Sequence, residues 1–93
     1  MSNFEKDIED ILTHLEDTLI SKNKDYGNSF DEQMDEFGLK AGAIRISDKF
    51  KRMKQLINNE ANVKDEALED TMLDLAGYSV LFYRYLTKVN NSN

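Results

Sequence analysis

Apolar residues recur every three or four positions along almost the whole of this chain, and no proline interrupts them. Proline breaks the interior of a helix, whereas this spacing lines up side chains along one helix face. The pattern therefore predicts an all-α fold, with three long helices and one short helix. We expect helices over residues 3–22, from 30 or 31 to 37, over 39–58, and from 63–65 to 89. A chain of 93 residues is one domain at this size, so we expect a single domain over 1–93 with a frayed tail at 90–93.

The ends of these helices carry start and stop signals. Ser2 and Glu5 have the spacing of a capping box at the start of the first helix. Residues 23–29 read Asn-Lys-Asp-Tyr-Gly-Asn-Ser, a composition that predicts a loop. Gly38 suits the end of the short helix, because glycine adopts the left-handed conformation there at little cost.

The last long helix is apolar almost all the way round. From Met72 to Tyr83 it reads MLDLAGYSVLFY, in which Asp74 is the only charge. A helix of this kind is buried, yet so short a chain has few other helices to surround it. We therefore expect a homo-oligomer, most simply a dimer, to complete the helical bundle.

On the second long helix, the stripe that we expect to be buried consists of Leu39, Ala43, Ile46, Phe50, Met53 and Ile57.

The composition excludes several kinds of site. Without cysteine, the chain has no disulfide, no thiol nucleophile and no Cys-based metal centre, and its single histidine, His14, excludes mechanisms that need two imidazoles. No apolar stretch approaches the ~20 residues that a membrane span needs. The acidic N-terminus is unlike a secretory signal. We therefore expect a cytoplasmic protein with no membrane partner.

The charge is unevenly distributed. The net charge is −6, yet eight of the twelve basic residues lie between Lys22 and Lys54. The overall negative charge disfavours generic nucleic-acid binding. A basic patch on an acidic protein instead favours a small anionic ligand.

Three carboxylates follow one another at intervals of four on the last helix, namely Glu66, Asp70 and Asp74. Like charges at this spacing repel, and a carboxylate in an apolar segment needs a partner. Mg²⁺ is one such partner, because it takes oxygen ligands from one or two carboxylates together with substrate phosphates. Ion pairs with the second long helix are the alternative for the two aspartates, and a favourable helix-dipole position is the alternative for Glu66.

The second long helix carries a cationic edge formed by Arg45, Asp48, Lys49 and Arg52. On a helix these residues fall within an arc of roughly 100°, away from the apolar stripe. Two guanidinium groups and an ammonium group on one edge can hold phosphates. The alternative is an exposed ion-pair ladder between Asp48 and Arg52, which contributes little to stability.

The segment Lys24-Asp25-Tyr26-Gly27 is a third candidate site. A tyrosine beside a flexible glycine can stack on a nucleobase, and Asp25 can bind a ribose hydroxyl or a metal ion. The alternative is an ordinary turn in which the tyrosine folds onto the core.

Three motifs occur together in this chain. They are KNKDYG at Lys22–Gly27, RISDKFKR at Arg45–Arg52 and DTMLDLAGY at Asp70–Tyr78. Over about residues 5–88 the chain resembles the nucleotide-modification-associated domain family (first type) of phages and prophages. Its acidic last helix is also similar to the MazG-like all-α nucleoside triphosphate pyrophosphohydrolases, helical oligomers whose carboxylates hold Mg²⁺.

This resemblance implies a nucleotide-binding protein of phage nucleotide metabolism or DNA modification. The residues implied in nucleotide binding are Lys24, Asp25, Tyr26, Arg45, Lys49, Arg52 and Tyr78. If the protein is a Mg²⁺-dependent pyrophosphohydrolase, the implied metal ligands are Asp70 and Asp74 with Asp48 or Asp25. The implied general base is then Glu66 or Glu69.

Two other functions fit the same residues. MazG-like enzymes carry an E-E-x-x-E motif on the earlier helix, where this chain has its cationic edge, and that difference favours a nucleotide sponge that binds without turnover. In the third hypothesis the chain is a protein-interaction module that binds a host regulator through its acidic first helix. Its aspartates and arginines then form internal ion pairs.

Overall fold

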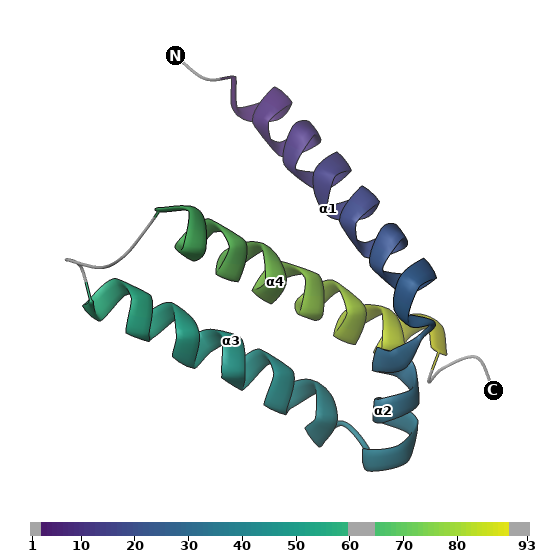
Figure 1. The fold of residues 1–93 in the computed structure, drawn as a ribbon. Coiled ribbons are helices and arrows are strands. Elements are labelled where there is room, and N and C mark those ends of the chain that lie inside the picture. Colours follow the sequence, from purple (N-terminus) through teal and green to yellow (C-terminus); the bar gives the residue numbers. More distant parts are fainter. Residues whose placement is uncertain (1–2, 60–64, 90–93) are drawn as a thin grey trace.

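The structure, a computed structural model, describes residues 3–59 and 65–89, and it confirms the predicted all-α fold (Figure 1). Three long helices and one short helix follow one another, and the last long helix ends in a π-helical turn. The elements are α1 (Phe4–Tyr26), α2 (Ser29–Phe37), α3 (Lys40–Asn58), α4 (Asp65–Arg84) and the π-helix η2 (Tyr85–Val89). The predicted frayed tail, 90–93, lies outside the described residues.

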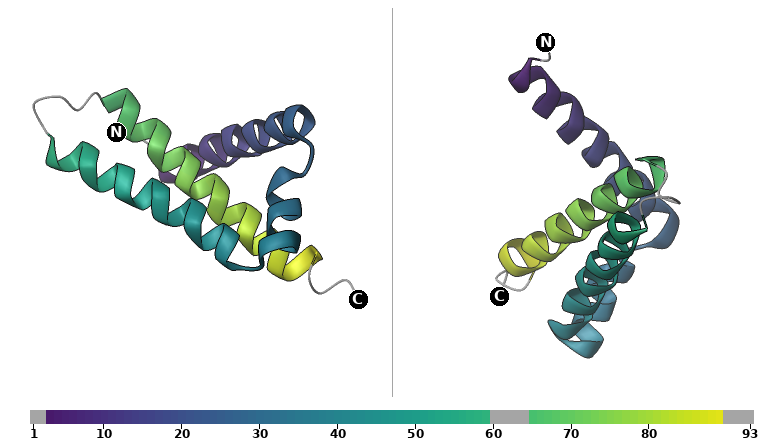
Figure 2. Two further views of the ribbon diagram at one scale, coloured as in Figure 1. Left: turned by 60° about the horizontal axis from the view of Figure 1, so that its bottom comes forward. Right: turned by 90° about the vertical axis from the view of Figure 1, so that its left-hand side faces the viewer.

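Helices α3 and α4 lie side by side and antiparallel, and α2 crosses the end of this pair (Figure 1). Helix α1 meets α4 through its C-terminal half, where Leu15 and Leu19 lie beside Gly77 of α4. Its N-terminal half diverges from the other helices, as Figure 1 and the right-hand view of Figure 2 show. The fold is therefore a splayed arrangement in which α1 and the α3–α4 pair diverge from a common corner.

That corner lies at the end of α1, where the sequence-based boundary was wrong. The helix runs through the segment predicted as a loop and ends at Tyr26. Gly27 ends it with a left-handed backbone (φ 57°), and its N–H donates to the Asn23 carbonyl at 2.8 Å. The side chain of Asn23 accepts a further hydrogen bond from the Asn28 N–H at 3.1 Å. Only Gly27 and Asn28 separate α1 from α2. Residues 23–26 stay helical although their helix propensity is weak, and the helix ends only at the glycine, which adopts the left-handed conformation.

The other predicted caps were right in one case and wrong in the other. Gly38 ends α2 with φ 81°, and its N–H donates to the Met34 carbonyl at 2.8 Å, as expected. The N-cap of α1 is Asn3 rather than Ser2, because the Asn3 side chain accepts the Lys6 N–H at 3.1 Å.

The core is small and is shared among the helices. The buried apolar side chains of the described residues are Leu15 of α1, Met34 of α2, Leu56 of α3 and Tyr85 of η2. Helix α3 faces α4 with Gly42 and Leu56 rather than with the predicted stripe. Of that stripe, Ile46 and Met53 are half-buried, whereas the exposed members are Leu39, Ala43, Phe50 and Ile57. The prediction missed the role of Gly42, where the absence of a side chain lets the Phe82 ring of α4 approach closely.

The hydrogen bond between Tyr85 and Asp35 joins the end of the chain to α2. The phenol O–H donates to Asp35 Oδ1 at 2.8 Å. This bond, and then burial, raises the pKa of Tyr85 above its ordinary value of 10.0. Because the pKa is higher in the folded than in the unfolded chain, the stabilisation is complete below about pH 10 and is lost as the pH rises through the folded pKa.

We therefore expect Tyr85→Phe to lower the thermal unfolding midpoint by about 2–5 °C at pH 7. The difference from the wild type should shrink above about pH 10, where the wild type loses the same hydrogen bond. Thermal unfolding followed by circular dichroism at pH 7 and pH 11 measures both effects. A difference of equal size at the two pH values would contradict this interpretation.

No helix among the described residues is long and apolar enough to cross a membrane.

Candidate functional site

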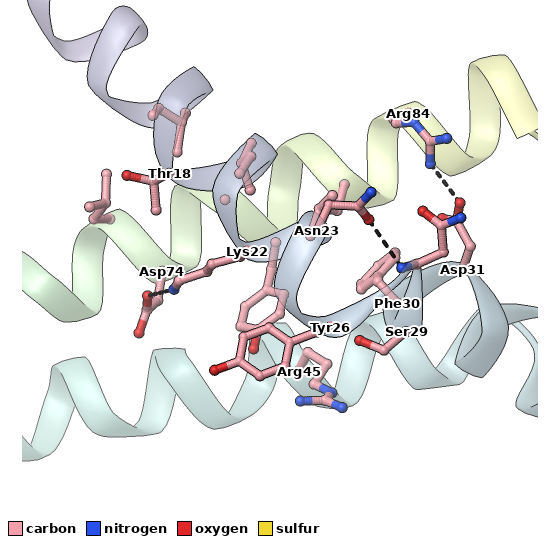
Figure 3. Close-up of a pocket in the computed structure, with 17 residues that line it drawn as sticks. Thr18, Lys22, Asn23, Tyr26, Ser29, Phe30, Asp31, Arg45, Asp74 and Arg84 are labelled. Atoms are coloured by element: carbon pink, nitrogen blue, oxygen red, sulfur yellow. Dashed lines mark hydrogen bonds and ion pairs between the residues drawn. The ribbon is translucent and has the colours of Figure 1, made fainter.

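A cavity of about 380 Å³ lies in the corner where α1 meets the other helices (Figure 3). The C-terminal half of α1 forms one wall, and the start of α2 forms another. Helix α4 provides the floor, and a single residue of α3, Arg45, reaches the rim. The short Gly27-Asn28 connection holds α1 and α2 at the angle that opens this space.

Aromatic rings line one side of the cavity. The rings of Phe30 and Tyr78 are stacked, with centroids 6.3 Å apart and an interplanar angle of 27°. Phe30 also contacts Phe82, with centroids 6.4 Å apart. Tyr26 lies at the mouth and keeps 71% of its surface exposed. The cavity therefore has a fixed aromatic wall and an exposed tyrosine beside it, which suits a flat apolar group.

Arg45 stands at the boundary of this cavity and a second one. The second cavity, of about 360 Å³, is lined by Arg45, Asp48, Lys49, Arg52, Thr71 and Tyr78. Both Arg45 and Tyr78 line the two cavities. The four residues of the cationic edge thus line one cavity, which adjoins the aromatic cavity at Arg45 and Tyr78.

The Arg45 guanidinium is fixed from two sides. Its Nε and Nη2 donate to Gln33 Oε1, at 3.2 and 2.7 Å. Its Cζ lies 5.9 Å from the centroid of the Tyr78 ring, within the range of a cation–π interaction. Because one side-chain oxygen accepts both of these donors, the remaining N–H groups stay available to an anionic ligand.

Asp74 links three helices. Its carboxylate pairs with Lys49 Nζ of α3 at 3.0 Å and with Lys22 Nζ of α1 at 3.5 Å. This arrangement answers part of the question that the sequence left open, because Asp74 pairs with lysines and forms no ion pair with Arg45 or Arg52 in the described chain. The two lysines neutralise the carboxylate and are held toward the cavities by it.

The donors for a metal ion are dispersed. Across residues 3–59 and 65–89, no three His, Cys, Asp or Glu side chains form a group that could hold a metal ion. Asp48 lines the second cavity and Asp74 the first, whereas the exposed Asp70 lines neither. With Asp74 engaged by two ammonium groups, the described carboxylates do not fit a metal site made by the protein alone.

The chain matches a family model described as nucleotide modification associated domain 1 over residues 22–83. The chain belongs to this family. No curated protein and no solved structure matches it. The matched region contains the whole cationic edge, the aromatic wall and the Asp74 ion pairs, so most of the site lies within it.

Among the described side chains, the other predicted site residues of this family member line neither cavity. Lys24 and Asp25 are exposed on the last turn of α1, and the exposed Glu69 lines neither cavity. The side chain of Glu66 lies outside the described residues. The structure thus brings together Tyr26, Arg45, Asp48, Lys49, Arg52, Asp74 and Tyr78.

Several site residues were missed by the sequence reasoning. They are Gln33, Asp31 and Arg84. Asp31 Oδ2 forms an ion pair with Arg84 Nη1 at 2.7 Å (Figure 3). The other oxygen, Asp31 Oδ1, is buried and has no hydrogen-bond partner, although the residue lines the aromatic cavity. Asp31 lies four positions after the first motif, but Arg84 is 53 positions from Asp31, and no local pattern indicates such a pair.

Proposed function

We propose that this protein binds a nucleotide, with the base in the aromatic cavity and the phosphates on the cationic edge. The observation that carries the proposal is that Arg45 and Tyr78 line both cavities. A ligand that spans them needs an apolar flat end and an anionic end, joined over a short distance. A nucleotide has this chemistry, and the family description concerns nucleotide modification.

The phosphate end is supported by three cations on one edge of α3. Arg45 is fixed by Gln33 with N–H groups to spare, and Lys49 is oriented by Asp74. Arg52 forms no ion pair within the described chain and lines the same cavity. Guanidinium groups bind phosphate bidentately, and lysine adds a point charge, so the edge suits two or more phosphate groups.

The base end is supported by the size and chemistry of the first cavity. Its volume of about 380 Å³ lies within the range of small-molecule sites. Tyr26 offers an exposed ring face on which a base can stack, beside the aromatic wall of Phe30 and Tyr78. The unpartnered Asp31 Oδ1 can accept a hydrogen bond from a ligand donor, such as a sugar hydroxyl or an exocyclic amino group.

Binding without turnover is the function that these residues support best. Pyrophosphohydrolysis, which the MazG-like resemblance implies, relies on a carboxylate cluster that holds Mg²⁺, and the described residues form no such group. We therefore derive no metal-dependent step. If Mg²⁺ takes part, we expect it to arrive with the phosphates of the nucleotide, because Mg²⁺ keeps several waters and few protein ligands in such sites.

Thermal stability against a panel of nucleoside mono-, di- and triphosphates tests the proposal. A ligand at 100 times its Kd stabilises by about 2.7 kcal/mol, which corresponds to a shift of roughly 10 °C or more in a domain this small. We expect that shift with at least one nucleotide, and a much smaller one with the matching nucleoside or with inorganic phosphate. Each sample is run with Mg²⁺ and with EDTA and is assayed for pyrophosphate.

Each outcome separates the functions under consideration. A shift without pyrophosphate release supports a binding protein, whereas Mg²⁺-dependent release would replace it with the hydrolase. No shift with any nucleotide would contradict nucleotide binding and favour the protein-interaction module, in which the charged residues are structural. In that case Asp74→Asn would lower the thermal stability of the protein, and neither the variant nor the wild type would be stabilised by a nucleotide.

A further inference from the structure

The chain exposes more surface than a self-contained protein of its mass. Its accessible surface is 7361 Å², whereas a compact monomer of this mass exposes roughly 5,500 Å². Its radius of gyration is 15.1 Å, against roughly 12 Å for a compact domain of this length. The excess of roughly 1,800 Å² is of the size that one subunit buries in an obligate homodimer.

Much of this surface is apolar and lies on the diverging half of α1. Within α1 only Leu15 is buried. Phe4, Ile11 and Leu12 keep 76%, 56% and 57% of their surface exposed. These residues continue the same helix face as Leu15, and the right-hand view of Figure 2 shows no other described element beside this half of the helix. An apolar stripe two to three turns long without a partner indicates a missing contact.

A matching stripe is exposed on α3. Leu39, Ala43, Phe50 and Ile57 lie on one line of that helix and are all exposed. They are the four members of the predicted buried stripe that α4 leaves exposed. Two helices of one chain therefore each present an uncovered apolar line, and the chain itself does not join them.

The charges beside the two stripes are opposite. The first fourteen residues of α1, 4–17, hold six acidic residues and one basic residue. Helix α3 holds six basic residues and one acidic residue. Glu9 and Glu16 flank the α1 stripe, whereas Lys51 and Lys54 flank the α3 stripe, and all four are exposed. Because charge complementarity fixes the choice of partner, the acidic stripe matches the basic one better than it matches itself.

We propose that the N-terminal half of α1 packs on the exposed stripe of α3 in a second copy of this chain. The contact is reciprocal: α1 of each copy packs on α3 of the other, so a single two-fold axis covers both stripes in both copies. This interface buries apolar surface on each subunit and leaves the cavities on the other edge of α3. It does not rest on the proposed nucleotide site.

Sedimentation velocity over 1–100 µM measures the assembly, and paired charge reversals locate its surface. We expect a dimer for the wild type and a dissociation constant raised at least tenfold by Glu9→Lys/Glu16→Lys. The variant Lys51→Glu/Lys54→Glu should weaken the dimer similarly. All four substitutions together should restore it, because the opposite charges then face one another again. The exposed pair Glu32→Lys/Glu36→Lys on α2 makes the same charge change away from the surface and should leave the dimer intact.

The substituted side chains are exposed, so circular dichroism should show an unchanged helix content in every variant. A wild-type monomer throughout the concentration range would overturn the proposal and assign the stripes to a different protein. A dimer that neither charge-reversed pair weakens, or that the fourfold variant fails to restore, would overturn the α1–α3 contact.

Discussion

Replacing Arg45 by glutamine should weaken nucleotide binding about 10- to 100-fold. Arg45 lines both cavities, and its guanidinium is fixed by Gln33 and lies close to the Tyr78 ring. A hydrogen bond to a charged group contributes about 1.5–3 kcal/mol, which corresponds to this range of affinity. Glutamine retains a polar side chain but loses the positive charge and the bidentate geometry. Isothermal titration calorimetry with the nucleotide that stabilises the wild type most measures the change.

Lys88→Gln provides the control for this substitution. It removes one positive charge from an exposed position outside both cavities, so it reports the effect of net charge alone. We expect its Kd to stay within twofold of the wild-type value. If Arg45→Gln bound the nucleotide as tightly as Lys88→Gln did, the phosphates would not lie on the cationic edge.

Replacing Gly42 by alanine should destabilise the fold by about 1–2 kcal/mol. A Cβ atom at this position would lie 2.5 Å from Cδ2 and Cε2 of the Phe82 ring and 3.1 Å from the Met34 sulfur. The half-buried Phe82 ring is packed between α3 and Phe30, so it makes room only if the helices shift, and overpacking of this kind costs about 1–3 kcal/mol. Alanine recovers roughly 0.5–1 kcal/mol by its higher helix propensity, which leaves the net loss.

Gly77→Ala is the matched control, since Gly77 is also a buried glycine inside a long helix. There an added Cβ would lie 3.4 Å from Leu19 Cδ2 and 3.9 Å from Leu15 Cδ1, within reach of ordinary packing. We expect this variant to be neutral or up to about 1 kcal/mol more stable than the wild type. Urea unfolding at one protein concentration compares the two. Equal stabilities would show that α3 and α4 are not in close contact at Gly42.

The sequence predicted the helices better than it predicted their faces. Spacing located all four helices, because periodicity is a local property that survives in any fold. The end of α1 was placed too early, because the polar residues 23–25 remain helical and the helix stops only at Gly27. On α3, hydrophobicity selected Leu39, Phe50 and Ile57 as buried, whereas close packing at Gly42 placed α4 beside the neighbouring face. Residue type alone does not reveal at which glycine a neighbouring helix packs closely.

The site was predicted in its outline but not in its connections. The cationic edge followed from one helix, so Arg45, Lys49 and Arg52 were found together. The pairing of Asp74 with Lys22 and Lys49 joins three helices and depends on how they cross. Gln33 reaches Arg45 only because α2 folds back on α3. Such contacts are set by tertiary structure, and no spacing rule within one helix specifies them.

The central claim is that a nucleotide spans the two cavities, and an NMR titration of the ¹⁵N-labelled protein tests this location most directly. With the nucleotide that gives the largest thermal shift, we expect the Arg45 Nε–Hε resonance to move together with the backbone amides of Phe30, Lys49 and Tyr78. The amides of residues 4–12 on α1 should stay in place, because they lie away from both cavities. Saturable shifts confined to that half of α1, or an unmoved Arg45 resonance at saturation, would contradict the claim.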